Sequence, residues 1–560
     1  MTPYEPPAGE VSRLLFEVLQ VDRQLAELPR LAEHADPDLL RQILGEASKF
    51  VAGVIAPLNR TGDETGARWD AGEVTLPPGA REAYAAFWQA GWPALSTAPE
   101  DGGQGLPAVM EMVLYEWLSG ANLGWTMAPG LLHGAYECLK HHASPELQRI
   151  YLPKVATGEW LATMCLTEPQ AGSDLGLVST RALPQADGSY QLTGTKIFIS
   201  GGEHDLTENI IHLVLARLPD SPPGPKGLSL FLVPKIHEDG TRNPLVCERI
   251  EEKMGLHASP TCVMRFDAAN GWLVGDVGKG LNAMFLMMNA ARLHVALQGV
   301  GVLDAAWHKA QAYALERRQM RAPVRRDPTA AADPIIDHPA VQRLLDTQRV
   351  WVDTGRIIAY QTAIELDVTK HHPDPGRRRQ AEVWCALVTP VLKAAWTEQG
   401  FRGASDCLQV FGGHGYIREW GIEQLVRDIR VAMIYEGTNE IQAQDLLLRK
   451  VLADKGLMLS AWLDRLQDDL TSLPSPTGHR ARSAVERLRH TLPRLLDAPA
   501  ADLYPVAGDF LRVVALTLMA WAMHKLAAAP DHESGLHEAF IRWIWPECPM
   551  RWEMISAASG

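Results

Sequence analysis

Hydrophobic positions along the chain change their spacing twice. From about residue 10 to 160, apolar residues recur every three or four positions, as in Val11, Leu14 and Val18, which predicts amphipathic helices. From about residue 160 to 275, short apolar runs alternate with turn signals, a pattern typical of strands. Beyond this segment the helical spacing returns and continues along the chain. The pattern predicts helices, then a β domain, then helices again.

The middle segment carries a hairpin signal. Asp187-Gly188 is a turn dipeptide directly before the β-rich run 189–199, which predicts a hairpin at this point. Short strands separated by turns favour an antiparallel barrel or sandwich over repeated strand–helix–strand units. Further strands are predicted at residues 210–216, 227–233 and 261–266.

Composition and charge narrow the class of protein. The chain has 560 residues, 46% hydrophobic and 21% charged, which is ordinary for a globular protein with three or four domains. The 53 Lys and Arg against 67 Asp and Glu give a net charge of −14. This charge opposes a broad nucleic-acid or anionic-membrane surface, but a local basic pocket for a phosphorylated ligand is compatible with it. Charges interrupt every apolar stretch before it reaches about 18 residues, so no membrane span is expected.

The cysteines and the first residues predict a cytoplasmic location. None of the seven cysteines forms a C-x-x-C pair or pairs with histidine at zinc-finger spacing, so we expect reduced thiols and no metal site. Residues 1–7 have neither the basic nor the apolar region of a signal peptide.

Several familiar catalytic motifs are missing from the sequence. There is no G-x-G-x-x-G after a strand, no phosphate-binding P-loop, no H-E-x-x-H and no G-x-S-x-G. A Rossmann dinucleotide site, a P-loop, a zinc protease and an α/β-hydrolase are therefore disfavoured. A nucleotide cofactor would have to bind in another way.

Two segments in the β region suit a flat ligand. Residues 164–174 predict a strand that runs into a turn rich in small residues and hydroxyls, where backbone amides lie open. In residues 194–202, strand alternation places Phe198 and Ser200 on one face, which suits a stacked ring with a hydrogen-bonding edge. Taken alone, the first segment is also compatible with an ordinary β-turn.

Two further segments lie in the second helical region. Residues 406–416 contain consecutive glycines, which allow a backbone to approach phosphate closely. In residues 434–442, Glu436 precedes Gly437 and Thr438 at the start of a helical pattern, so its carboxylate can be presented into a cavity. A solvated surface glutamate is the ordinary alternative for Glu436 taken alone.

Together the four segments resemble the acyl-CoA dehydrogenase family, in particular a longer bacterial subgroup with an added C-terminal helical domain. Three segments, 202–217, 250–255 and 415–421, are similar to the 3-methylmercaptopropionyl-CoA dehydrogenases of dimethylsulfoniopropionate catabolism. The resemblance implies an α+β fold that is mostly α. The implied domains are an N-terminal helical domain (1–160), a middle antiparallel β domain with the flavin and acyl-CoA site (161–278), a C-terminal four-helix bundle with the catalytic base (279–455) and an additional helical domain (456–560).

The resemblance also implies site residues. Glu436 matches the catalytic base, and because residues 290 and 291 are both Ala, the alternative base position of some members is not filled. The implied FAD contacts are Met164, Leu166, Thr167, Ser173, Phe198, Ser200, Arg317, Gln319, Gln409, Gly412, Gly413, Thr438 and Glu440. The implied substrate contacts are Ser173, Arg292, Tyr435 and Gly437.

This chain departs from the usual family pattern in three places. Phe198 stands where Trp is frequent, Met320-Arg321 where Phe-Gly is usual, and Glu440 where Gly or Gln is frequent. Phe198 keeps an aromatic platform and loses the indole N–H.

The reaction implied is α,β-dehydrogenation of a short or medium acyl-CoA thioester, with 3-methylmercaptopropionyl-CoA among the candidates. Glu436 would take the α-proton while flavin N5 takes the β-hydride, and an electron-transferring flavoprotein would accept the electrons. Arg317 and Gln319 match a motif that reaches the flavin of a neighbouring subunit, which implies a homodimer with a shared flavin site. Two alternatives stay open: an acyl-CoA oxidase that passes electrons to oxygen, and a non-catalytic flavin-binding relative.

Overall fold

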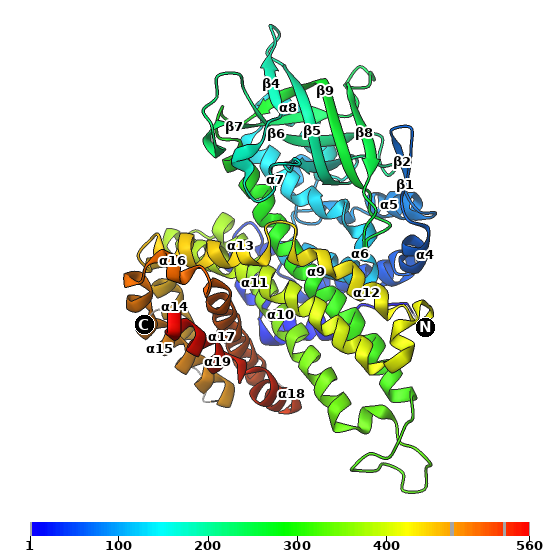
Figure 1. Ribbon diagram of the computed structural model, residues 1–560, viewed down its shortest axis with the longest axis vertical. Coiled ribbons are helices and arrows are strands. Elements are labelled where there is room, and N and C mark those ends of the chain that lie inside the picture. The colour runs from blue at the N-terminus through cyan, green and yellow to red at the C-terminus, as the bar shows by residue number, and fades with distance from the viewer. Residues whose placement is uncertain (1–2, 471–474, 530–533, 559–560) are drawn as a thin grey trace. The chain divides into compact units, whose positions relative to one another are not determined.

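A computed structural model describes residues 3–470, 475–529 and 534–558, and these residues are mostly helical with one large sheet (Figure 1). The chain forms two compact units. Unit 1 contains Met1–Ala52, Pro107–Ala121 and Arg292–Gly560, and unit 2 contains Gly53–Leu106 and Asn122–Ala291. The predicted additional domain, 456–560, includes residues 471–474, 530–533 and 559–560, which lie outside the described residues.

Unit 2 contains the large sheet. Its seven strands follow the order β3-β6-β4-β5-β9-β7, and β8 pairs with β9. An additional pairing of β6 with β7 closes the path into a barrel. The strands are β3 (Leu161–Cys165), β4 (Arg181–Pro184), β5 (Tyr190–Ser200), β6 (Ile210–Arg217), β7 (Leu228–Pro234), β8 (Leu245–Ile250) and β9 (Thr261–Val274).

The barrel confirms most of the predicted strand pattern. β4 and β5 form the predicted antiparallel hairpin, and Gly188 in its turn has a φ of 85°, which glycine adopts without steric cost. The expectation of antiparallel pairing is wrong for two pairs, because β6 runs parallel to both β3 and β4. Parallel neighbours need a long crossover, and the segment between β3 and β6 supplies one. No range was predicted for β4, the first strand of that hairpin, and β8 was not predicted.

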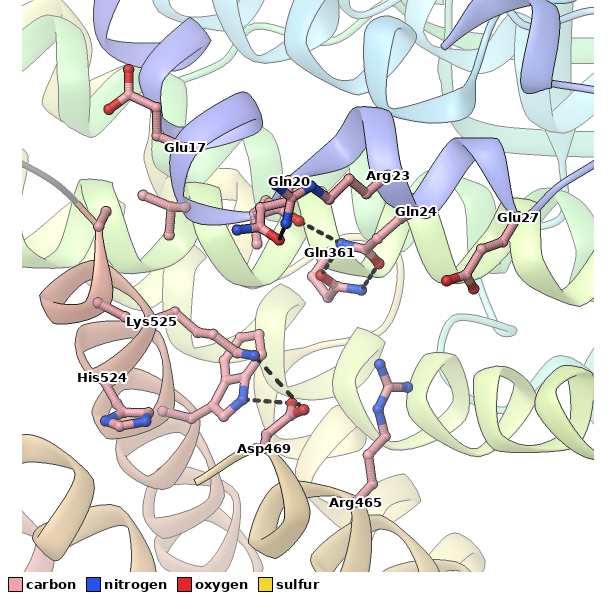
Figure 2. Close-up of a pocket in the computed structure, with 15 residues that line it drawn as sticks. Glu17, Gln20, Arg23, Gln24, Glu27, Gln361, Arg465, Asp469, His524 and Lys525 are labelled. Atoms are coloured by element: carbon pink, nitrogen blue, oxygen red, sulfur yellow. Dashed lines mark hydrogen bonds and ion pairs between the residues drawn. The ribbon is translucent and has the colours of Figure 1, made fainter. Parts of the chain in front are cut away.

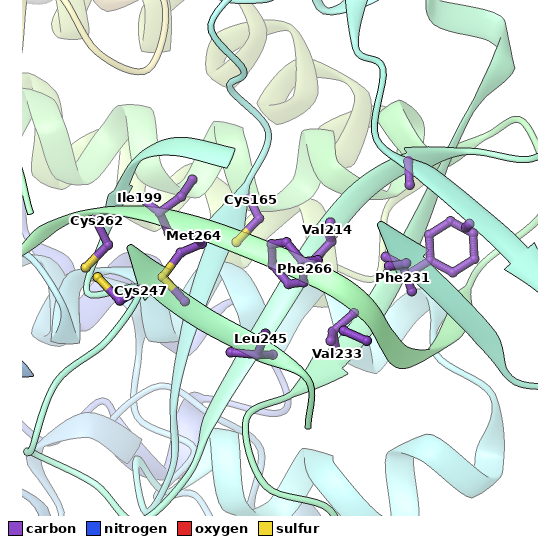
Figure 3. Packing of buried hydrophobic residues seen from close by; sticks show 14 of the residues in the cluster. Cys165, Ile199, Val214, Phe231, Val233, Leu245, Cys247, Cys262, Met264 and Phe266 are labelled. Atoms are coloured by element: carbon purple, nitrogen blue, oxygen red, sulfur yellow. The ribbon is translucent and has the colours of Figure 1, made fainter. Parts of the chain in front are cut away.

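Alternating side chains of the barrel strands fill its interior. Figure 3 shows part of this core, in which aliphatic, aromatic and sulfur-containing side chains from all seven barrel strands pack together. Phe231 and Phe266 are its two phenylalanines, and both are buried. Burial of such side chains stabilises the barrel and holds the loops at its ends in place.

The remaining elements of unit 2 are short. Ser144 begins one helix by accepting a hydrogen bond from the Leu147 N–H at 3.3 Å, with Pro145 at the first helical position. The helices are α4 (Leu58–Thr65), α5 (Ala80–Gln89), α7 (Leu132–His142) and α8 (Pro145–Ala156), and a two-stranded sheet joins β1 (Arg68–Asp70) to β2 (Glu73–Thr75).

Two helices have residues in both units. Helix α6 (Ala108–Thr126) is interrupted at Asn122, where the backbone leaves the helical region, and α9 (Gly280–Glu316) continues without such a break.

Unit 1 is helical. Its other helices are α1 (Ala8–Arg13), α2 (Val21–Ala26), α3 (Pro37–Phe50), α10 (Pro339–His371), α11 (Pro375–Val410), α12 (Ile422–Ile429), α13 (Asn439–Gln444), α14 (Leu457–Asp469), α15 (Pro476–Asp497), α16 (Ala500–Leu503), α17 (Ala507–Ala528), α18 (Ser534–Ala539) and α19 (Glu547–Ala558). Figure 1 shows the long helices α10 and α11, which pack against each other, and α13 packs on α11. This arrangement agrees with the helical C-terminal part that the sequence predicts.

Close packing in unit 1 explains one glycine pair. A Cβ added at Gly299 of α9 would lie 2.4 Å from the Trp396 carbonyl oxygen of α11. A Cβ at Gly301 would lie 2.2 Å from the Glu116 carbonyl oxygen of α6. These glycines therefore allow helix backbones to approach closely, and no ligand is needed to explain them.

A buried network of charges and hydroxyls links four segments of unit 1. The Arg356 guanidinium contacts Glu116 at 2.7 Å and Asp304 at 2.8 Å, and the Tyr4 hydroxyl donates to Asp304 at 2.5 Å. Tyr360 donates its hydroxyl hydrogen bond to Glu116. Because each buried charge has a partner, the network ties the first residues of the chain to α6, α9 and α10.

One helix among the described residues, α17, is long and apolar enough to cross a membrane. Within the structure, 89% of its apolar stretch is buried. Its apolar side chains therefore pack against neighbouring helices such as α10, α11 and α15.

Candidate active site

The segment around Glu436 has an unusual backbone. Glu436 has a φ of 53° and Gly437 a φ of 83°, so two successive residues adopt the left-handed conformation. This conformation is uncommon for a residue with a side chain and is frequently associated with functional sites. At Gly437 a Cβ would also lie 2.7 Å from Nε2 of Gln442, so the position suits glycine. Thr438 then begins α13, its hydroxyl accepting from the Ile441 N–H at 3.3 Å.

Side chains from three helices hold the loop 435–439. From α11, the Lys393 ammonium donates to the Gly437 carbonyl oxygen at 2.7 Å and to Oδ1 of Asn439 at 3.1 Å. From α13, Gln442 donates through Nε2 to the Glu436 carbonyl oxygen at 3.0 Å. The Tyr435 hydroxyl donates to Oε1 of Gln298 on α9. The carboxylate is therefore carried by a loop whose backbone is fixed on several sides.

Burial and charge act in opposite directions on the Glu436 carboxyl. Burial raises its pKa, the positive charges of Arg292 and Lys393 lower it, and the result is a pKa of about 7. Burial also disfavours the charged form of Lys393 and lowers its pKa to about 7, although the negative charge of Glu436 acts in the opposite direction. A carboxylate with a pKa near neutrality is suited to accept a proton from carbon.

A second group of predicted residues lies at the end of α9. Aromatic side chains attach the glycine turn after α11 to this end: Tyr313 stacks on Phe411 at 4.3 Å and accepts or donates a hydrogen bond with His414 at 2.9 Å. Arg317 follows Tyr313 by one helical turn, and its N–H donates to the Tyr313 carbonyl oxygen at 2.9 Å, so it lies at the same end of α9 as Tyr313.

The predicted residues of this second group are accessible. Arg317, Gln319, Gln409, Gly412 and Gly413 are all exposed. A Cβ added at either glycine would meet no described atom within 4 Å, so the turn backbone is open to a ligand. Met320, where the family usually has Phe, is exposed and has a left-handed φ of 56°.

A third group lies in unit 2. Phe198 sits in a bulge of β5, where the register with β9 shifts between Lys196 and Ile199, and its φ is 60°. Its side chain is 61% exposed, which is unusual for phenylalanine. The Ile197 N–H donates to the Thr167 carbonyl oxygen at 2.9 Å, so the bulge and the turn after β3 are joined.

The bulge corrects the predicted alternation along residues 197–200. The extra residue breaks the period of two, so that Phe198 is exposed, Ile197 and Ser200 are half-buried and Ile199 is buried. Met164, Leu166 and Thr167 are half-buried and Ser173 is exposed.

Sequence reasoning assigned no role to the ion pair beneath this turn. The Lys196 ammonium donates at 2.9 Å to both Glu168 Oε1 and the Leu166 carbonyl oxygen. Glu168 also accepts hydrogen bonds from the backbone and side chains of Ser179 and Thr180. In the sequence, this ion pair could have been suspected only from the presence of a lysine within an otherwise apolar predicted strand.

Lys393, Gln298 and Gln442 were also missed around Glu436. Lys393 gave a signal, because it is the one charged residue of the stretch 383–397. The two glutamines gave none, since a glutamine on a helix is ordinary.

The described residues fit the FAD that the family resemblance implies. An exposed aromatic platform at Phe198 suits a flat ring system. The open backbone at Gly412 and Gly413, with the exposed guanidinium of Arg317 nearby, suits an anionic diphosphate. Phe198 belongs to unit 2, and Arg317, Gly412 and Gly413 belong to unit 1.

A cavity of about 500 Å³ lies elsewhere in unit 1 (Figure 2). Its wall includes Trp521, whose indole N–H donates to Asp469 at 3.0 Å, and Lys525, which pairs with the same carboxylate at 3.7 Å. Gln24 and Gln361 form hydrogen bonds with each other at another side. Among the described residues that line it, none belongs to the predicted site.

Comparison with known proteins identifies the class. Family models for the acyl-CoA dehydrogenase N-terminal, middle and C-terminal domains match residues 38–159, 163–269 and 278–450. The chain belongs to the acyl-CoA dehydrogenase family. The sequence-based family assignment, the fold class and the enzyme class are therefore confirmed.

One relative and two solved structures are similar over most of the chain. The 3-methylmercaptopropionyl-CoA dehydrogenase of Ruegeria pomeroyi is 46% identical over 459 residues, covering 81% of this chain and 77% of that protein. Caenorhabditis elegans ACDH-11 in complex with C11-CoA superposes with a TM-score of 0.82 at 20% identity, covering 99% of this chain and 94% of that one. The FAD complex of an acyl-CoA dehydrogenase from Bacillus anthracis gives 0.71 at 21% identity, covering 93% and 87%. At these identities the two structures establish the fold.

Proposed function

We propose that this protein is an FAD-dependent dehydrogenase that converts an acyl-CoA thioester to the trans-2-enoyl-CoA. The observation that carries the proposal is the Glu436 carboxyl, which stands in a left-handed loop with a pKa of about 7. The family supports the reaction class, because relatives at 46% and 35% identity are named as acyl-CoA dehydrogenases.

Glu436 is the base of the proposed reaction. Its carboxylate accepts the α-proton, the electron pair of the broken Cα–H bond forms the new double bond, and a hydride leaves Cβ. Bound FAD supplies the oxidation by accepting that hydride. Arg292, Tyr435, Gly437 and Ser173 are the proposed substrate contacts.

The remaining residues of the predicted set are proposed to hold FAD. In unit 2 these are Met164, Leu166, Thr167, Phe198 and Ser200, with Ser173 shared with the substrate. In unit 1 they are Arg317, Gln319, Gln409, Gly412, Gly413, Thr438 and Glu440. The exposure of Phe198, Arg317 and the two glycines supports this assignment.

The partners and location of the protein belong to the same proposal. A homodimer with a shared flavin site would account for the exposed Arg317 and Gln319, and an electron-transferring flavoprotein is the proposed electron acceptor. A cytoplasmic location is proposed from the cysteine pattern.

A sulfur-containing short acyl group is the first substrate to test. The relative that is 46% identical is named for 3-methylmercaptopropionyl-CoA. Straight-chain butyryl-CoA and octanoyl-CoA provide short and medium references without sulfur.

The test is anaerobic mixing of the flavin-loaded full-length protein with each acyl-CoA. We expect at least one thioester to bleach the flavin absorbance and to yield the enoyl-CoA. Glu436→Gln should keep the bound flavin and slow bleaching by about 10²–10⁴-fold, because the amide cannot accept the α-proton. Bleaching by the variant at the wild-type rate would refute Glu436 as the base.

The same experiment separates the two alternatives. Rapid reoxidation of the reduced protein in air would indicate an oxidase. Bound flavin that no acyl-CoA of the panel bleaches would indicate a non-catalytic relative.

A further inference from the structure

Lys393 is a fully buried lysine on α11 that the proposed reaction does not yet use. Its side chain is 0% exposed, and it is the one charge in an otherwise uncharged stretch, residues 383–397. A buried ammonium is costly unless its hydrogens are paired. It donates hydrogen bonds to the Gly437 carbonyl and the Asn439 side chain, which both belong to the loop that carries Glu436.

Asn439 connects this lysine to the loop a second time. Its Nδ2 donates to the Ala394 carbonyl oxygen at 3.0 Å, and Thr397 donates to its Oδ1 at 3.3 Å. Four hydrogen bonds, two from Lys393 and two more through Asn439, therefore attach the loop to α11. The left-handed conformation at Glu436 costs energy, and such a conformation persists only where its surroundings hold it.

Several charged or titratable groups act on this site. Arg292 on α9 and Lys393 on α11 are the two positive charges that act on Glu436. Tyr435 neighbours Glu436 in the loop, and Glu440 on α13 acts on Lys393. Lys450, beyond α13, interacts with Arg292 and Asp445.

We propose that Lys393 is a positioning residue for Glu436, which fixes the loop through the Gly437 carbonyl and whose ammonium, when protonated, favours the ionised carboxylate. The inference rests on the proposed function, since it concerns the base of that reaction. Lys393 acts through Glu436 and takes no part in the proton transfer itself.

Lys450 provides a matched control. It is also a mostly buried lysine, and it donates to the Ala386 carbonyl oxygen of the same helix α11 at 2.5 Å. Its acceptors lie outside the loop 435–439. Replacement of either lysine by methionine removes one buried ammonium, and only one of the two replacements removes a charge that acts on Glu436.

The experiment measures anaerobic flavin reduction by saturating acyl-CoA as a function of pH, in flavin-loaded full-length protein. Glu436 must lose its proton to act as a base, so the rate rises with pH through the pKa of Glu436. In Lys393→Met we expect this rise to move about 1–2 pH units higher, with a rate at least about 10-fold lower at pH 6.5. In Lys393→Arg, which keeps the charge, the rise should stay within about half a pH unit of wild type. Lys450→Met should keep the wild-type pH profile.

Each outcome decides the proposal. An unchanged pH profile in Lys393→Met, with stability lowered or not, would overturn it, because a merely structural lysine does not set the profile. If Lys393→Met does not fold, Lys393→Arg and Asn439→Ala decide. Asn439→Ala should slow flavin reduction several-fold without moving the profile. A wild-type rate in Asn439→Ala, or a profile of Lys393→Arg displaced by more than half a pH unit, would overturn the proposal. Failure of the proposed function is seen separately, as wild-type bleaching in Glu436→Gln.

Discussion

Glu168, which is buried, and Glu436, which is half-buried, each have a lysine nearby, and their chemistry is opposite. In unit 2, Lys196 contacts the Glu168 carboxylate directly at 2.9 Å. In unit 1, Lys393 contacts the backbone oxygen of Gly437, the residue after Glu436, at 2.7 Å. Burial raises the pKa of both carboxyls. At Glu168, the charge of Lys196 and the hydrogen bonds of Thr180 and Ser179 outweigh burial and lower the pKa to about 2. At Glu436, burial prevails and the pKa is about 7.

The difference lies in where the donors point. Glu168 accepts hydrogen bonds on both carboxylate oxygens, which stabilises the ionised form. Around Glu436 the donors of Lys393 and Gln442 are directed to the backbone of the loop. The Lys196–Glu168 ion pair therefore fixes a turn. Lys393 fixes a loop and leaves the Glu436 carboxylate able to exchange a proton.

The largest expected effect is on stability after removal of the Glu168 charge. Glu168→Gln leaves Lys196 buried without its counter-charge and should reduce the free energy of unfolding by about 3–5 kcal/mol. The measurement is urea-induced unfolding followed by tryptophan fluorescence. Glu436→Gln should not lower this free energy, because no direct ion pair is broken and burial already disfavours the ionised carboxyl.

An exposed ion pair on the same barrel is the control for this prediction. Glu248 and Arg265 approach to 2.8 Å, but both side chains are exposed. Glu248→Gln should therefore change the unfolding free energy by about 0–1 kcal/mol. Equal losses in Glu168→Gln and Glu248→Gln would show that burial of the Glu168 pair does not matter.

The pH dependence of stability should have opposite signs for the two glutamates. The pKa of Glu168 is lowered, so its stabilisation, up to about 3 kcal/mol, is present above about pH 4.5 and lost as the pH falls toward 2. The pKa of Glu436 is raised, so its contribution is most favourable below about pH 4.5 and is lost as the pH rises through 7. Unfolding of wild type and the two Gln variants across pH 3–8 measures both slopes. If the contributions of the two glutamates to the free energy of unfolding changed with pH in the same direction, this prediction would be wrong.

The smallest expected effect concerns two similar helix caps. Thr438 and Ser144 each accept a hydrogen bond at 3.3 Å from the third residue after them, in unit 1 and unit 2 respectively. Replacement of either by Ala should lower stability by about 1 kcal/mol. Only Thr438→Ala should also slow flavin reduction, since it lies in the loop of Glu436. A comparable slowing in Ser144→Ala would mean that the rate follows general stability.

Much of the fold and part of the site could be predicted from local sequence. The change of hydrophobic period predicted the helical, β and helical regions, because burial of one face imposes that period on helix and strand alike. The Asp187-Gly188 dipeptide predicted the β4–β5 hairpin, since its turn requires a left-handed glycine. Glu436-Gly437-Thr438 predicted a helix start, which Thr438 forms at α13.

Other features were not accessible to local reasoning. The bulge that exposes Phe198 depends on pairing with β9, a strand more than sixty residues away, and period-two alternation gave the wrong neighbours for it. Closure of the barrel through β6 and β7 is likewise a property of the complete set of strands.

The sequence by itself determined the family of this protein, the order of its helical and β regions and the position of Glu436 in a motif, because each depends on residues adjacent along the chain. Only the tertiary structure decided how that carboxylate behaves. The groups that hold its loop, Lys393 and Gln298, lie 44 and 137 residues from their partners. A pKa is set by burial and by charges in space, and neither is written in the order of residues.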